Sequence, residues 1–170
     1  MRDYQKIARE CLEEVKDCGI QPGNIAAFVT NGRLSHAWGR CVFRRSTNIN
    51  TIELQPFLLE DATPLEVLKA TLIHEILHTC EGCHNHGAIW ESYTHRINAR
   101  YGYKVTQYAT QEEISACMEA GTFSPEARFR YIIDCARCGQ RICRSKMSAF
   151  VRDPGRYVCS CGSAQWVRIK

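Results

Sequence analysis

Residues 72–90 of the chain read LIHEILHTCEGCHNHGAIW and contain the pattern His-Glu-Ile-Leu-His. His74 and His78 are four residues apart, so on a helix both imidazole rings project from one face. Two imidazoles at this spacing can bind one tetrahedral zinc ion, and zinc lowers the pKa of its bound water to about 7. Glu75 would then be the general base that takes a proton from this water. The pattern predicts a catalytic zinc site.

The residues around this motif predict the helices that carry it. Thr63-Pro64-Leu65-Glu66 has the composition of a capping box with proline at the first helical position, and Gly82 is a helix stop. We expect a helix over Pro64–Glu81 and a second helix over Gly87–Arg100. Thr110-Gln-Glu-Glu113 is another capping-box pattern and predicts a short helix that ends at Gly121.

Upstream of the motif, the pattern changes from helix to strands. Apolar residues at helical spacing predict a first helix over Ile7–Cys18. Strand-forming residues follow over Ile25–Val29, Ser35–Phe43 and Thr51–Leu54, and Asn31-Gly32 is a hairpin turn signal. Three short strands in a row favour an antiparallel meander.

A catalytic zinc ion needs a third protein ligand, and two histidines compete for this role. His84 follows His78 by six residues, the spacing of metzincins, but the glycine expected three residues after His78 is displaced to Gly82. His86 follows His78 by eight residues and lies at the start of the next predicted helix. Spacing alone leaves both histidines open.

The C-terminal part of the chain has the cysteine pattern of a second zinc site. Cys135-x-x-Cys138-Gly and Cys159-x-Cys161-Gly are separated by twenty residues, close to the spacing of a zinc ribbon with a structural zinc ion. The second knuckle is one residue short, which leaves Cys143 as a substitute ligand, although we favour a buried strand thiol there. Ser124-Pro125 marks the boundary, so the expected domains are residues 1–124 and 125–170.

The other features of the composition concern compartment and charge. No N-terminal signal segment and no membrane-spanning apolar run is present, so we expect a cytoplasmic protein, where thiols stay reduced. Cys80 and Cys83 could form a redox pair or a second metal site, but we favour the interpretation that they are small buried residues of a turn.

From Phe129 onward, nine Lys/Arg and two Asp/Glu give a charge of +7, against +4 for the whole chain. Such a basic segment, interleaved with aromatics, suits nucleic acid. The candidate nucleic-acid-binding residues are Arg137, Arg141, Arg144, Lys146 and Arg156.

Four segments together resemble the SprT-like family, which includes the Spartan protease. They are Trp38-Gly39-Arg40-Cys41, Ile52–Leu59, the HEILH motif and His86-Gly87-Ala88-Ile89-Trp90. The resemblance implies that His86 is the third ligand and Glu75 the catalytic base. It also implies a minimal zincin-like α+β domain, with helices packed on a small antiparallel sheet whose edge strand pairs with a peptide. We take Trp38–Phe43 as that edge, and Tyr93 as a weak candidate for oxyanion stabilisation.

The expected function is a monomeric zinc metalloendopeptidase with one catalytic and one structural Zn²⁺. Its substrate is a protein or peptide, and DNA is a candidate partner because Spartan-type proteases act on proteins crosslinked to DNA. That association would place the protein on the nucleoid. The alternatives are a non-enzymatic nucleic-acid-binding or regulatory protein on the same scaffold and a zinc hydrolase for another amide.

Overall fold

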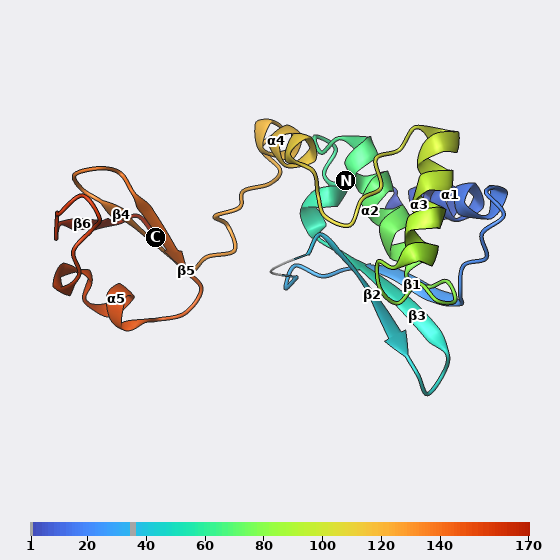
Figure 1. Ribbon diagram of the computed structural model, residues 1–170, viewed down its shortest axis with the longest axis horizontal. Helices are drawn as coiled ribbons and strands as arrows, with labels where there is room; N and C mark the ends of the chain where they lie inside the picture. The colour runs from blue at the N-terminus through green and yellow to red at the C-terminus, as the bar shows by residue number, and fades with distance from the viewer. Residues whose placement is uncertain (1, 35–36) are drawn as a thin grey trace. The chain divides into compact units, whose positions relative to one another are not determined.

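Three helices cover a three-stranded sheet in the first part of the chain (Figure 1). The computed structural model describes residues 2–34 and 37–170, so Ser35 and His36 of the predicted second strand lie outside the described residues. The chain divides into two units, Met1–Phe123 and Ser124–Lys170. The predicted α+β class is confirmed, with two small sheets and a cysteine cluster in the second unit.

The elements of the first unit are α1 (Tyr4–Asp17), β1 (Ile25–Thr30), β2 (Gly39–Arg44), β3 (Ile49–Leu54), the 3₁₀ turn η1 (Pro56–Leu59), α2 (Leu65–Leu77), α3 (Ala88–Tyr101) and α4 (Gln111–Glu119). The capping box predicted at Thr110 is confirmed, because its side chain accepts from Glu113 N–H while the Glu113 carboxylate accepts from Thr110 N–H. Gly102 ends α3 in the left-handed conformation, with φ of 73°.

The sheet of the first unit is mixed, so the predicted antiparallel meander is wrong. Its strand order is β1-β3-β2, with β1 parallel and β2 antiparallel to β3. Asn31 makes no hairpin with β2, because its backbone N–H donates to Leu54 O (2.8 Å) and its side-chain amide donates to Glu53 (2.8 Å). Asn31 therefore extends the pairing of β1 with β3, and β2 lies on the far side of β3 as an edge strand.

Helix α2 is the central element of this unit. It contacts α1, α3, β2, β3 and η1, and its apolar side chains are buried on most of its circumference. Leu68, Leu72, Ile73, Ile76 and Leu77 are all fully buried. Because α2 is buried on most of its circumference, its contacts with these neighbours fix its orientation.

The structure corrects both predicted ends of α2. Thr63 does not cap the helix; its hydroxyl donates to Phe57 O at 2.6 Å, and Pro64 has no side-chain capping bond. The helix ends at Leu77 rather than Glu81, because the N–H groups of Thr79 and Cys80 donate to the carbonyls only three residues back. His78 is therefore the C-terminal cap and still lies on the same face as His74.

The second unit is a small antiparallel sheet with short helical turns. Its elements are β4 (Tyr131–Cys135), β5 (Arg141–Arg144), α5 (Ala149–Arg152), the 3₁₀ turn η2 (Pro154–Arg156) and β6 (Trp166–Arg168), with strand order β5-β4-β6. Across the described residues of both units, no helix is long and apolar enough to cross a lipid bilayer.

The buried Thr63 hydroxyl gives a stability prediction. Thr63→Val keeps the side-chain shape but removes the bond to Phe57 O, so the free energy of unfolding should fall by about 1 kcal/mol. Thr63→Ser keeps the hydroxyl and should retain this bond. Chemical denaturation of both variants checks the assignment; equal stability of Thr63→Val and wild type would contradict it.

Candidate metal centre

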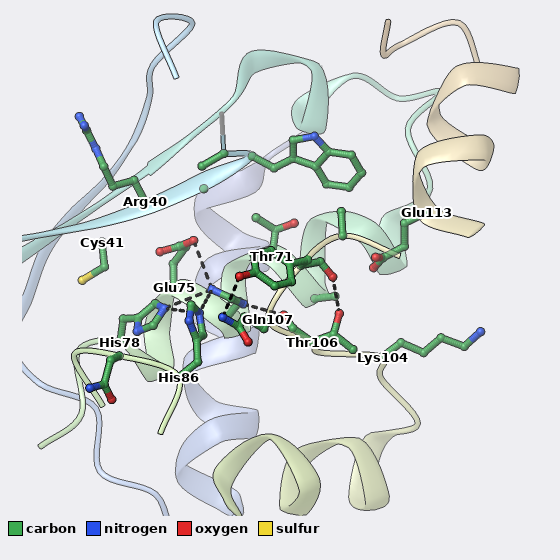
Figure 2. Close-up of a pocket in the computed structure, with 18 of the residues that line it drawn as sticks. Arg40, Cys41, Thr71, Glu75, His78, His86, Lys104, Thr106, Gln107 and Glu113 are labelled. Carbon is green, nitrogen blue, oxygen red and sulfur yellow. Dashed lines mark hydrogen bonds and ion pairs between the residues drawn. The ribbon is translucent and has the colours of Figure 1, made fainter. Parts of the chain in front are cut away.

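Three histidine side chains converge on one point between α2 and the start of α3 (Figure 2). The Nε2 atom of His78 lies 3.2 Å from that of His74 and 3.1 Å from that of His86, and the remaining Nε2 pair is 3.1 Å apart. A tetrahedral zinc ion about 2.0–2.1 Å from each nitrogen needs them about 3.3 Å apart. The spacing of the three nitrogens therefore fits one zinc ion.

Hydrogen bonds on the far side of two rings place a proton on Nδ1 of each ring. His74 Nδ1 donates to Thr106 O at 2.9 Å, and His78 Nδ1 donates to Cys83 O at 2.7 Å, since a carbonyl can only accept. Burial lowers the pKa of His74 to about 4, and the charge of His78 lowers it as well. Burial, with a further contribution from His78, also lowers the pKa of His86. With the Nδ1 proton turned away, the Nε2 lone pairs of His74 and His78 are available to a shared cation.

Of the two histidines left open by spacing, His86 is the one that the structure brings to this point. His84 is exposed, and its ring lies 5.9 Å from the ring of Phe43, centroid to centroid. His86 precedes α3, whose first turn returns toward α2 after the turn at Gly82, where φ is 75°. The residue implied by the family resemblance therefore has the right position.

Glu75 lies beside the histidine cluster and is held by the edge strand β2. Its carboxylate is 4.0 Å from His74 Nε2, and its side chain is only 7% exposed. Burial raises its pKa to about 8, and a hydrogen bond from the Cys41 N–H opposes this shift. A Cβ atom at Gly39 would lie 2.7 Å from Glu75 Cγ, so only glycine fits there without displacing the carboxylate. A cation at the histidines would favour the ionised form of Glu75.

The histidines and Glu75 lie in a cleft of about 770 Å³. Edge strand β2 lines it with Gly39, Cys41 and Phe43, and the preceding turn of α2 contributes Ala70 and Thr71. The segment from Lys104 to Glu113 supplies further lining residues, as Figure 2 shows for Thr106 and Gln107.

The oxyanion candidate Tyr93 does not line this cleft. Its ring packs on the core of the first unit and lies under the Arg96 guanidinium, 5.5 Å from the ring centroid. The exposed Tyr108 lines the cleft instead and had no motif to point to it. The roles of Thr106 and Cys83 could not be predicted from the sequence either, because both residues act through backbone carbonyls, which any residue carries.

The four ribbon cysteines form a second candidate zinc site. The Sγ atoms of Cys135 and Cys161 are 3.6 Å apart, as are those of Cys138 and Cys159. Tetrahedral zinc with sulfur at about 2.3 Å needs about 3.8 Å between sulfurs. The shortened second knuckle thus still brings both its thiols to the cluster, which does not include Cys143 of β5.

Backbone amides lower the pKa of two ribbon thiols, those of Cys135 and Cys159. The N–H groups of Cys138 and Arg137 help to lower the pKa of the Cys135 thiol to about 6, which favours a metal-binding thiolate. By contrast, Cys80 and Cys83 are 2% and 0% exposed in the core, and burial raises the pKa of both thiols, that of Cys80 to about 12. Their position agrees with small buried residues of the turn.

The five candidate nucleic-acid-binding residues are all exposed but differ in their partners. Arg141 pairs with both Glu126 and Asp134, and Arg156 pairs with Asp153. Arg137 and Arg144 donate only to backbone carbonyls, of Cys161 and Cys143. The charges of Arg137, Arg144 and Lys146 are therefore the ones without a carboxylate partner in the described part of the chain.

Comparison with known proteins gives one family. The chain matches the SprT-like family over residues 5–110, a span that includes Glu75 and the three clustered histidines but none of the ribbon cysteines. No curated protein matches the chain.

The two histidines of the loop give opposite predictions for metal content. His86→Ala should remove one equivalent of zinc from the purified protein, because one of three ligands is lost, whereas His84→Ala should remove none. Elemental analysis of both variants, after dialysis against a weak chelator, makes the comparison. Loss of zinc in His84→Ala alone would reverse the assignment.

Proposed function

The chain belongs to the SprT-like family, and on this premise we propose that it is a zinc-dependent metalloendopeptidase. The observation that carries the proposal is the convergence of three Nε2 atoms beside a carboxylate that strand β2 holds in place. A site that only stabilised the fold would be closed by a fourth protein ligand, whereas here the described residues supply three in an open cleft.

In peptide hydrolysis, different residues of the chain would have different roles. His74, His78 and His86 would hold the zinc ion, which when bound acidifies a water molecule and polarises a carbonyl. Glu75 takes the proton of the attacking water and later gives it to the leaving amine. The Cys41 N–H and the backbone of Gly39 keep the carboxylate turned toward the histidines during both transfers.

The edge of the sheet offers a place for an extended substrate. Strand β2 pairs with β3 on one side only and lines the cleft along the other. Backbone groups of an unpaired edge can bind a peptide by adding a strand, which is largely independent of peptide sequence. We therefore infer an unfolded or flexible protein segment as the substrate.

The second unit supports an action on proteins associated with or crosslinked to DNA. Its charge of +7 from Phe129 onward and its unpaired Arg137, Arg144 and Lys146 suit phosphate binding. The alternative, a nucleic-acid-binding protein without catalysis, shares these features. It gives no reason for Glu75 to be aligned beside the histidine cluster.

Substitution of the carboxylate tests the enzyme proposal directly. Glu75→Ala should lower the rate of casein or histone cleavage by about 10²–10⁴-fold while zinc content stays unchanged. Gly39→Ala should lower the rate in the same direction, because the added Cβ displaces the Glu75 side chain rather than the backbone. Glu81→Ala, on the exposed loop after α2, is the matched control. Equal cleavage by Glu75→Ala and wild type would remove the catalytic assignment.

The role of the second unit in DNA binding is tested with single-stranded DNA. The double variant Arg144→Ala/Lys146→Ala should weaken binding, and the slope of log affinity against log salt should fall by about 0.7 for each lost phosphate contact. Lys6→Ala/Arg9→Ala on exposed positions of α1 changes the net charge equally and is the control. If both double variants bind single-stranded DNA with the same affinity, or if DNA does not alter the cleavage rate, the second unit does not direct the protein to DNA.

A further inference from the structure

One aromatic side chain contacts all three clustered histidines. The ring centroid of Trp90 lies 5.0 Å from that of His74, 5.9 Å from that of His78 and 4.6 Å from that of His86. Trp90 belongs to the first turn of α3 and is 3% exposed. The indole therefore forms one buried wall of the histidine cluster, behind the cleft rather than along it.

The three histidines differ in what holds their rings. The Nδ1 atoms of His74 and His78 each have a backbone carbonyl as partner. In the described part of the chain, His86 Nδ1 has no such partner, and the only hydrogen-bond neighbours of this ring are the other two histidines. A ligand without a hydrogen bond to its second nitrogen is free to rotate unless packing prevents it.

Packing against Trp90 supplies this restraint. The planes of the His86 and Trp90 rings meet at 89°, an edge-to-face arrangement that is among the favoured ones for aromatic pairs. Of the three histidine–tryptophan pairs, this is also the shortest. The indole therefore packs most closely against the one ring that no carbonyl holds.

The polar atom of Trp90 has no hydrogen-bonding role that would explain a tryptophan at this position. Its Nε1–H is buried, and no acceptor lies within reach among the described residues. A buried donor without a partner is unfavourable, so hydrogen bonding gives no reason for a tryptophan at this position. The packing surface that the indole ring offers to the histidines gives such a reason.

We propose that Trp90 is a positioning residue of the metal centre, whose ring holds His86 in the orientation that the carbonyls of Thr106 and Cys83 impose on His74 and His78. The inference rests on the zinc site of the proposed function and not on proteolysis itself. It predicts that the shape of the aromatic ring matters and that the indole N–H does not.

The test measures zinc affinity in the full-length protein, by competition with a chelator of known affinity. The zinc equivalent that is absent from His86→Ala identifies the histidine site. Trp90→Leu should weaken this site by about 10–100-fold, the usual effect of removing a residue that supports a metal ligand. Trp90→Phe keeps an aromatic wall and loses the unpartnered N–H, so its affinity should stay within about threefold of wild type.

A variant of the same helix separates positioning from general destabilisation. Ile97 is fully buried on α3, seven residues after Trp90 and about two helical turns further along the helix. Ile97→Ala should lower the thermal midpoint of unfolding but leave the zinc affinity of the folded protein unchanged. Unchanged affinity in Trp90→Leu, equal losses in Trp90→Phe and Trp90→Leu, or an equal loss in Ile97→Ala would each overturn the proposal. A wild type that binds zinc but cleaves nothing would overturn the proposed function and leave this inference standing.

Discussion

Three imidazole nitrogens that face one another within 3.1–3.2 Å are the constraint on which the first unit depends. Without a cation, their lone pairs and the buried carboxylate of Glu75 would repel one another in a poorly solvated site. The surrounding structure maintains this arrangement. Helix α2 and its C-terminal cap position two of the histidines, the Gly82 turn returns the chain with the third, and β2 approaches from the other side. A cation bound at these nitrogens would therefore stabilise the fold as well, as in many small metal-binding domains.

Much of this arrangement was predictable from local sequence. A helix with histidines at positions i and i+4, the capping box at Thr110 and the spacing of the ribbon cysteines are short-range patterns, and the structure has all of them. The choice between His84 and His86 was not, because loop geometry depends on where α2 ends. That end is set by Thr79, whose hydroxyl donates to Ile76 O and accepts from Gly23 N–H, 56 residues earlier in the chain.

The prediction of the strand order was wrong for a related reason. Asn31-Gly32 has the composition of a hairpin turn, but turn composition does not say which strand will be the partner. Here the backbone of Asn31 pairs with the end of β3, and that choice gives β3 the central position. The mistake matters for function, since it is the crossing of the chain to the far side of β3 that makes β2 an exposed edge beside the cleft.

The contact between Gly39 and Glu75 has a consequence for how the two halves of the cleft move. The strand approaches the carboxylate so closely that a Cβ atom at Gly39 has no room, and the Cys41 N–H of the same strand favours the ionised carboxylate, which lowers the pKa of Glu75. A displacement of β2 toward α2 at Gly39 would therefore press directly on the Glu75 side chain. On the proposed function, a segment that docks on the free edge of β2 would therefore also restrain the position of the Glu75 carboxylate.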